Sequence, residues 1–259
     1  MNSLFRQYKL TDTCDLECGP CKLWQRNTEE EFPFLSEVYK DLEVLKKRGV
    51  RYLNFTGGDP LLHPNVVEIL KKAKSLGFKT AVTTHGGNYL GFQTGLKDLA
   101  DLMIFLLHSH EPGVHDQIAG VDSYSKVISA IEFAQENKQK VMISFNVTRD
   151  NIQFIPEMHE LVTAKKALLW LNPLPISYGI NGFKAESLQY IKHYGRRPNI
   201  WLNLASLWYL ENKQAGLKER QDCIARDEII TLAESKINIP YMLNMFSWIV
   251  LRWKLAKQR

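Results

Sequence analysis

Over the first 175 residues, short segments typical of strands alternate with longer segments in which apolar residues recur with the period of a helix. Six short segments are predicted to be strands: Phe5–Leu10, Tyr52–Phe55, Lys79–Thr83, Leu102–Leu107, Val141–Val147 and Leu168–Leu171. The segment Leu102–Leu107 is a continuous apolar run, the pattern of a strand that is buried on both faces of a parallel sheet. Between several of these segments, apolar residues recur every three or four positions, as on one face of a helix; these stretches are Leu35–Leu45, Val66–Ala73, Ser125–Glu136 and Ile152–Ala164. The alternation predicts β-then-α units joined by right-handed crossovers.

This order of elements predicts an α/β fold, with a partial (β/α)6 barrel of the TIM type over residues 1–175. Gly49 and Gly77 follow the last periodic residues of the first two helices. Because glycine tolerates the left-handed conformation that commonly ends a helix, we expect both helices to end there.

Residues 176–259 break the alternation and predict a small C-terminal α+β extension. Leu188–Tyr194 and Trp201–Leu210 are expected to be helical, and a hairpin of Ile229–Leu232 and Ile237–Ile239 should follow them. A last helix is rich in Trp, Phe and Met on nearly all of its sides. That distribution favours a lid packed across the open side of the barrel over an amphipathic segment on a membrane surface or a partner.

The net charge of +5 is concentrated at the end of the chain. Four basic residues and no acidic one lie in Met242–Arg259, so the rest of the chain is close to neutral. A general nucleic-acid-binding surface is therefore not expected. No apolar run reaches the roughly 18–20 residues of a membrane span, and four cysteines do not form the framework of a secreted disulfide protein. We expect a cytoplasmic protein.

The stretch Thr11–Trp24 holds three of the four cysteines, Cys14, Cys18 and Cys21, in a C-x3-C-x2-C spacing. Loops this short can turn three thiolates toward one point, and thiolates are soft ligands that suit iron–sulfur clusters or zinc. Three protein ligands leave the fourth iron of a cubane open, so that a substrate or cofactor can bind there.

Polar and glycine-containing segments directly follow the other predicted strands. The turn Gly57–Pro60, the pair Thr84 and His85, and His108 all stand in such places. Since functional groups gather at the carboxyl ends of parallel strands, we expect these segments and the cysteine loop on one rim of the sheet.

Together, C-x3-C-x2-C and the motif Gly57–Pro64 after the second strand resemble the radical S-adenosylmethionine (SAM) superfamily, over about Leu4–Pro175. The resemblance implies a [4Fe-4S] cluster held by the three cysteines, with the amine and carboxylate of SAM on the fourth iron. It implies reductive cleavage of SAM to a 5′-deoxyadenosyl radical that abstracts hydrogen from a substrate. A reductant protein such as flavodoxin or ferredoxin is the implied partner.

The resemblance also assigns residues of the turn to the SAM site. Gly57 and Gly58 are implied to let backbone carbonyls approach the SAM amine, since a Cβ would intrude. Asp59 stands where the family usually has Glu, and Pro60 follows it. At the third cysteine, Pro20 replaces the usual aromatic residue.

Four further residues match the SAM site of the family. Thr84 and His85 match a Thr-Asn segment, with His in place of Asn; a solvated or structural role for His85 is an equal alternative. His108 begins a segment like the one after the fourth strand, where Leu106 replaces a common Ser. Asn146 matches a polar position near the ribose, and a capping or turn role is its alternative.

Cys223 and the hairpin after it resemble the opening of a SPASM/Twitch auxiliary-cluster domain. The hairpin ends in Pro240-Tyr241 where that pattern has Pro-Cys, so we interpret the region as a degenerate remnant without a cluster. Cys223 is a buried structural thiol, a hydrogen-atom donor that quenches a substrate radical, or a coincidence of sequence.

The leading functional hypothesis is a radical SAM enzyme, and the remnant hairpin favours a peptide or another natural-product precursor as substrate. One alternative is a protein that binds the cluster and SAM without radical catalysis. The other is a structural zinc module with Cys223 or a histidine as fourth ligand.

Overall fold

The computed structural model describes residues 4–19, 21, 23–25, 32–173 and 183–203. The chain divides into two compact units. The first comprises Met1–Leu106 and Ala119–Val141, and the second comprises Leu107–Ile118 and Met142–Arg259.

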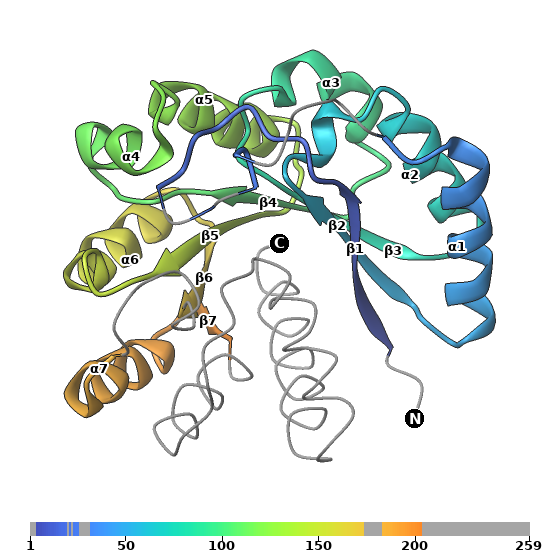
Figure 1. Cartoon of the computed structure of the whole chain (residues 1–259). Helices are drawn as coiled ribbons and strands as arrows, with labels where there is room; N and C mark the ends of the chain where they lie inside the picture. The colour runs from blue at the N-terminus through green and yellow to red at the C-terminus, as the bar shows by residue number, and fades with distance from the viewer. Residues whose placement is uncertain (1–3, 20, 22, 26–31, 174–182, 204–259) are drawn as a thin grey trace. The chain divides into compact units, whose positions relative to one another are not determined.

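The first unit is a four-stranded parallel layer covered by helices (Figure 1). Its strands are β1 (Phe5–Thr11), β2 (Tyr52–Gly57), β3 (Lys79–Thr84) and β4 (Leu102–Leu106). Its helices are α1 (Leu35–Lys47), α2 (Val66–Ser75), α3 (Tyr89–Leu96) and α5 (Tyr124–Glu136), and a 3-10 turn, η1 (Pro60–Leu62), follows β2. In Figure 1 these helices lie along one face of the four strands.

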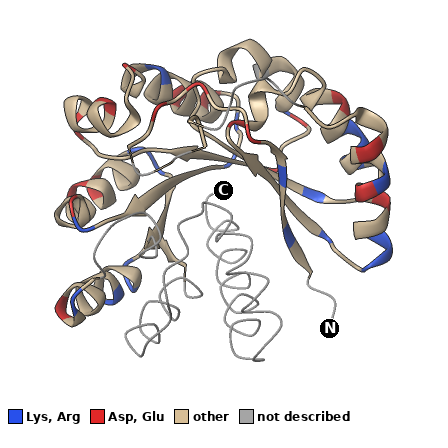
Figure 2. Ribbon diagram, viewed as in Figure 1, with Lys and Arg blue, Asp and Glu red and all other residues tan. Residues whose placement is uncertain are grey.

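Helix α1 shows why the amphipathic stretches become helices. Val38 and Leu42, four positions apart, are fully buried, whereas the acidic and basic residues of the helix are exposed. Figure 2 shows residues of both charges along α1. The amide N–H of Phe34 donates to the Glu37 carboxylate at 3.2 Å, which caps the first turn. Gly49 follows the helix with φ 82° and Gly77 follows α2 with φ 77°, so both predicted helix ends are confirmed.

The second unit contains the strands β5 (Val141–Val147), β6 (Leu168–Pro173) and β7 (Ile200–Leu202), paired in parallel. Helix α4 (Pro112–Ala119) follows β4, and the helices α6 (Ile155–Ala164) and α7 (Ala185–Gly195) precede β6 and β7; a 3-10 turn, η2 (Ile152–Phe154), leads into α6.

The seven strands keep the order of the sequence, with β1 and β7 as the two ends. The predicted α/β class with a partial, open barrel is therefore confirmed. All six predicted strands are present, and α7 covers the predicted helix Leu188–Tyr194.

The helix predicted from Trp201 is wrong at its start, because Ile200–Leu202 forms β7. Asn199 has a left-handed φ of 62°, which redirects the chain, and the strand then pairs with β6. The hairpin and the last helix lie outside the described residues, and the domain boundary at residue 175 stays a prediction. Among the helices that the structure describes, none is long and apolar enough to cross a membrane.

Candidate cluster and cofactor site

The cysteine loop is fixed to the turn after β2 by backbone contacts. The amide N–H of Gly58 donates to the carbonyl of Thr11, and that of Asp59 donates to the carbonyl of Thr13, each at 2.8 Å. A Cβ on Gly57 would lie 2.1 Å from the Thr11 carbonyl oxygen, and one on Gly58 would lie 2.0 Å from that of Thr13. Both glycines are therefore required for the turn to lie against the loop.

A second contact fixes the loop to Ala119 and Gly120, which belong to the same unit. The amide N–H of Glu17 donates to the carbonyl of Ala119 at 3.0 Å. Gly120 has φ +76°, and a Cβ there would lie 2.7 Å from the carbonyl oxygen of Glu17. The cysteine-bearing segment is thus held on both sides before any metal binds.

The three cysteines share one apolar cluster with Leu16 and Ala119. Cys18 is buried, and Cys14 and Cys21 are half-buried. Cys21 donates its amide N–H to the Cys18 carbonyl at 2.9 Å, and the Trp24 indole Nε1 donates to the same oxygen at 3.2 Å.

Burial raises the pKa of the Cys14 thiol to about 11 and that of Cys18 to about 12. Without a metal these thiols hold their protons, and metal binding must displace the protons. Three thiol groups in one fixed loop form a donor set that suits a [4Fe-4S] cluster.

The Asp59 carboxylate is fully buried and joins this turn to the end of β3. Its Oδ1 accepts from the amide N–H of Leu61 at 2.8 Å. Its Oδ2 accepts from the Thr84 hydroxyl at 2.6 Å and from the amide N–H of His85 at 3.2 Å. Pro60, also buried, begins η1 directly after it.

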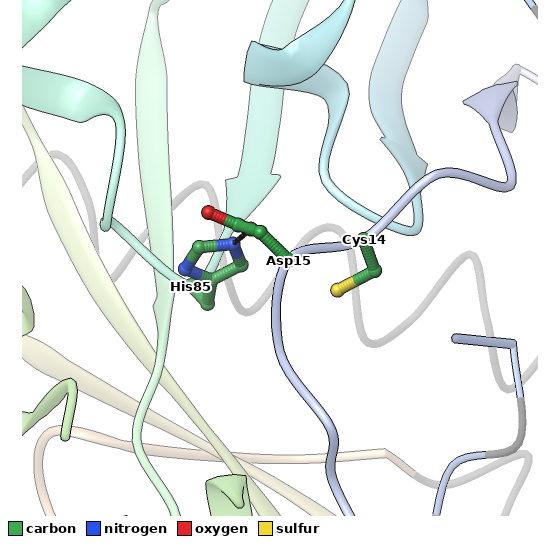
Figure 3. Close-up of side chains that lie close together, drawn as sticks. All are labelled: Cys14, Asp15 and His85. Atoms are coloured by element: carbon green, nitrogen blue, oxygen red, sulfur yellow. Dashed lines mark hydrogen bonds and ion pairs between the residues drawn. The ribbon is translucent and has the colours of Figure 1, made fainter. Parts of the chain in front are cut away.

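His85 lies between two carboxylates. Its Nε2 is 2.5 Å from Asp15 Oδ1 and 2.8 Å from Asp59 Oδ2, and the Asp15 contact is drawn in Figure 3. Its Nδ1 lies 3.1 Å from the amide nitrogen of Gly87 and accepts from that N–H when the ring is neutral, so the proton of the neutral imidazole is assigned to Nε2. Because the ring is 4% exposed, the solvated alternative for His85 is excluded.

The pKa values of this group follow from burial and charge. Burial alone would lower the pKa of His85, but the carboxylates of Asp59 and Asp15 raise it to about 10. Burial would raise the pKa of Asp15, but the hydrogen bond from His85 holds it below its usual value. Donor atoms of Cys14, Asp15 and His85 all lie within 4.8 Å of one another.

Sequence reasoning missed Asp15 and Asn88 as members of this site. Asn88 Nδ2 donates to Asp15 Oδ2 at 3.0 Å. The available signal was an acidic residue directly after the first cysteine, together with a histidine directly after the third strand.

His108 and Asn146, the other two predicted residues, belong to the second unit. The amide N–H of His108 donates to His115 Nδ1 at 3.1 Å. Asn146 Oδ1 accepts from Asn172 Nδ2 at 2.8 Å, and Asn172 Oδ1 accepts from Asn203 Nδ2 at 2.9 Å. This chain of amides across β5 and β6 to the end of β7 was also missed, although the three asparagines stand at the ends of successive strands.

Pro20 and Cys223 lie outside the described residues, as does the segment that ends in Pro240-Tyr241. Their suggested roles, and the interpretation as a SPASM/Twitch remnant, stay predictions.

Residues 8–162 match the family model of the Radical SAM superfamily. The chain belongs to this superfamily. Its family cofactors are a [4Fe-4S] cluster and SAM, which confirms the predicted pair of cofactors.

Curated relatives include several probable GTP 3′,8-cyclases. The protein of Thermoplasma volcanium is 29% identical over 190 residues, which cover 72% of this chain and 57% of the relative. The protein of Sulfolobus acidocaldarius is 30% identical over 151 residues, which cover 57% of this chain and 48% of the relative. The chain thus spans about half the length of these relatives.

Two solved structures have a similar fold. Streptococcus suis SuiB bound to the precursor peptide SuiA has a TM-score of 0.67 at 17% identity, over 85% of this chain and 53% of SuiB. The anSMEcpe structure with AdoMet and the Cp18Cys peptide has a TM-score of 0.60 at 18% identity, over 77% of this chain and 63% of anSMEcpe.

Proposed function

We propose that this radical SAM protein is an enzyme that cleaves SAM reductively and removes a hydrogen atom from a substrate. The observation that carries the proposal is the docking of the cysteine loop on the Gly57–Gly58 turn. The proposal is supported because the loop with the three cysteines lies against a turn that resembles the SAM-binding turn of the family.

The residues of the chain have separate tasks in this proposal. Cys14, Cys18 and Cys21 hold the cluster by exchanging their thiol protons for iron. The hydrogen bonds to Thr11 and Thr13 fix the loop in advance. When bound, the cluster and SAM supply the electron and the 5′-deoxyadenosyl radical of the reaction.

Further residues of the proposed SAM site come from the ends of other strands. Gly57, Gly58, Asp59 and Pro60 form the turn after β2, and Thr84 and His85 end β3. His108 and Asn146 belong to the second unit and follow or end β4 and β5, at strand ends where the ligands of such sheets bind; their part in SAM binding stays a prediction from the sequence.

Two substrate classes are candidates. A peptide substrate is supported by the likeness to SuiB, whose structure contains a precursor peptide. A purine nucleotide is supported by the similarity to probable GTP 3′,8-cyclases. We propose a flavodoxin- or ferredoxin-type reductant as partner and a cytoplasmic location, since a reducing compartment keeps the thiols available for iron.

The test is anaerobic reconstitution with iron and sulfide, followed by SAM and dithionite. Visible absorption of an iron–sulfur cluster and release of 5′-deoxyadenosine are the expected results, and Cys18→Ala should lose both. A cluster without 5′-deoxyadenosine would favour the protein that binds without catalysis, and zinc in place of iron would favour the zinc module. Stimulation of cleavage by GTP would select the nucleotide.

A further inference from the structure

Two carboxylates lie beside the cysteine loop, and they differ in their access to a ligand. The side chain of Asp59 is fully buried, whereas that of Asp15 is 46% exposed. This difference in exposure matters because SAM is a cation whose amino group donates hydrogen bonds. The inference below rests on the proposed function, since it concerns how that site holds SAM.

Asp59 is already committed within the protein. It accepts from the amide N–H groups of Leu61 and His85 and from the Thr84 hydroxyl, and the imidazole of His85 contacts it at 2.8 Å. A carboxylate accepts about four hydrogen bonds in all. A SAM amine that reached Asp59 would therefore have to displace bonds that hold the end of β3 in place.

The Asp15 carboxylate can accept further hydrogen bonds. Its Oδ1 contacts His85 Nε2 at 2.5 Å, and its Oδ2 accepts from Asn88 Nδ2 at 3.0 Å. These two contacts and the amide N–H of Asp15 itself leave part of its acceptor positions for a ligand. Asp15 also follows Cys14 directly, and their ligand atoms lie within 4.8 Å of each other. Its carboxylate is thus adjacent to a proposed cluster ligand.

His85 holds Asp15 in this position. The Gly87 amide donates to Nδ1, which turns Nε2 and its proton toward the carboxylates. With one or two protons on the imidazole, the group of two carboxylates and one histidine keeps a net negative charge. The group therefore attracts a cation beside the cluster in either state.

We infer that Asp15, held by His85 and Asn88, presents its carboxylate to the amino group of SAM. Asp59 is then a positioning residue that orients His85 and Thr84 and does not contact the cofactor. The carboxylate that recognises the amine comes from the cysteine loop itself.

The test is a cycle that pairs a substitution in the protein with removal of the amino group from the ligand. S-adenosylhomocysteine and its analogue without the amino group, 5′-S-(3-carboxypropyl)-5′-thioadenosine, are titrated by equilibrium dialysis. The protein carries its cluster, and affinities are expressed per cluster. The wild type is compared with Asp15→Asn, Asp59→Asn and Asp12→Asn. Asp12 is the matched control, because it is an exposed acid of the same segment that pairs with Lys9 at 3.0 Å.

We expect Asp15→Asn to lower the affinity for S-adenosylhomocysteine at least tenfold, which corresponds to about 1.4 kcal/mol of binding free energy. The affinity for the amine-free analogue should change less than threefold. Asp12→Asn should leave both affinities unchanged. Asp59→Asn should lower the melting temperature of the protein and lower its affinity for both ligands to a similar degree.

Two results overturn the inference. In the first, Asp15→Asn lowers the affinity for both ligands equally. In the second, Asp59→Asn lowers the affinity only for the ligand with the amino group, and Asp15→Asn lowers neither affinity. Failure of the wild type to bind S-adenosylhomocysteine would contradict the proposed function instead, so the two failures are distinguishable.

Discussion

Gly58→Ala tests whether the cysteine loop is fixed by the close approach of two backbones. The added Cβ would lie 2.0 Å from the Thr13 carbonyl oxygen and 2.7 Å from that of Asp12. Ordinary contact needs more than 3 Å, so the loop must move by about 1 Å or more. Both neighbouring atoms belong to the backbone, and no side-chain rotation relieves the clash.

The displacement acts on two hydrogen bonds, Gly58 to Thr11 and Asp59 to Thr13. Losing them costs about 1 kcal/mol each, and overpacking adds about 1–3 kcal/mol. We expect a total destabilisation of about 3–5 kcal/mol, which corresponds to a melting temperature lower by roughly 10 °C in a domain of this size.

Two measurements follow the effect: thermal unfolding of the metal-free protein, and iron bound per chain after reconstitution. Gly91→Ala is the matched control, since it lies in α3 and a Cβ there meets no atom within 4 Å. It should stabilise by up to about 1 kcal/mol, because alanine favours the helix. A Gly58→Ala protein with the melting temperature and iron content of the wild type would refute the reasoning.

Three further substitutions test other parts of the structure. Asp101→Asn removes the partner of Lys74 and of the Thr80 amide, each at 2.8 Å, and should cost about 1–2 kcal/mol. Burial alone would raise the pKa of Asp101, but these hydrogen bonds lower it overall. The stabilisation by Asp101 is therefore complete above about pH 5 and is lost as the pH falls below about 4. Urea unfolding of both proteins should show that the difference between their unfolding free energies decreases over this range. Gly49→Ala places a side chain at φ 82° and should cost about 1 kcal/mol in the same assay, whereas an unchanged midpoint would contradict a strained helix end. Trp24→Phe removes the indole bond to the Cys18 carbonyl and should speed loss of iron to a chelator severalfold, unless that bond does not support the loop.

The fold was largely predictable because its strands are buried on one or both faces. Leu102–Leu106 is a continuous apolar run, which is typical of a strand buried on both faces and not of a surface segment. Helix α3 was missed because its glycines, Gly91 and Gly95, weaken the helical pattern. Strand β7 was missed because three residues give no period, and it is the pairing with β6 that makes the strand.

The site was predictable where its chemistry is local in sequence. Three cysteines within eight residues and a Gly-Gly turn are visible without a structure. The ion pair of Asp15 with His85 joins positions 70 residues apart, and no periodicity encodes such a contact. The steric partners of Gly57 and Gly58 were also hidden, because the atoms that exclude a side chain belong to another segment of backbone.

The two departures from the family pattern at positions 59 and 85 form one structural change. A carboxylate one methylene shorter than Glu stays on its own turn, where Asp59 accepts the Leu61 amide and remains fully buried. An imidazole is longer than the usual Asn side chain, and His85 contacts Asp59 at 2.8 Å while also reaching Asp15 at 2.5 Å. Asp59 extends less far than a Glu would, and His85 extends further than an Asn would. The exposed carboxylate that His85 contacts is that of Asp15. Reverting only one position, as in Asp59→Glu, should therefore crowd His85 and destabilise the protein more than the double change Asp59→Glu with His85→Asn, which a thermodynamic cycle of unfolding free energies measures.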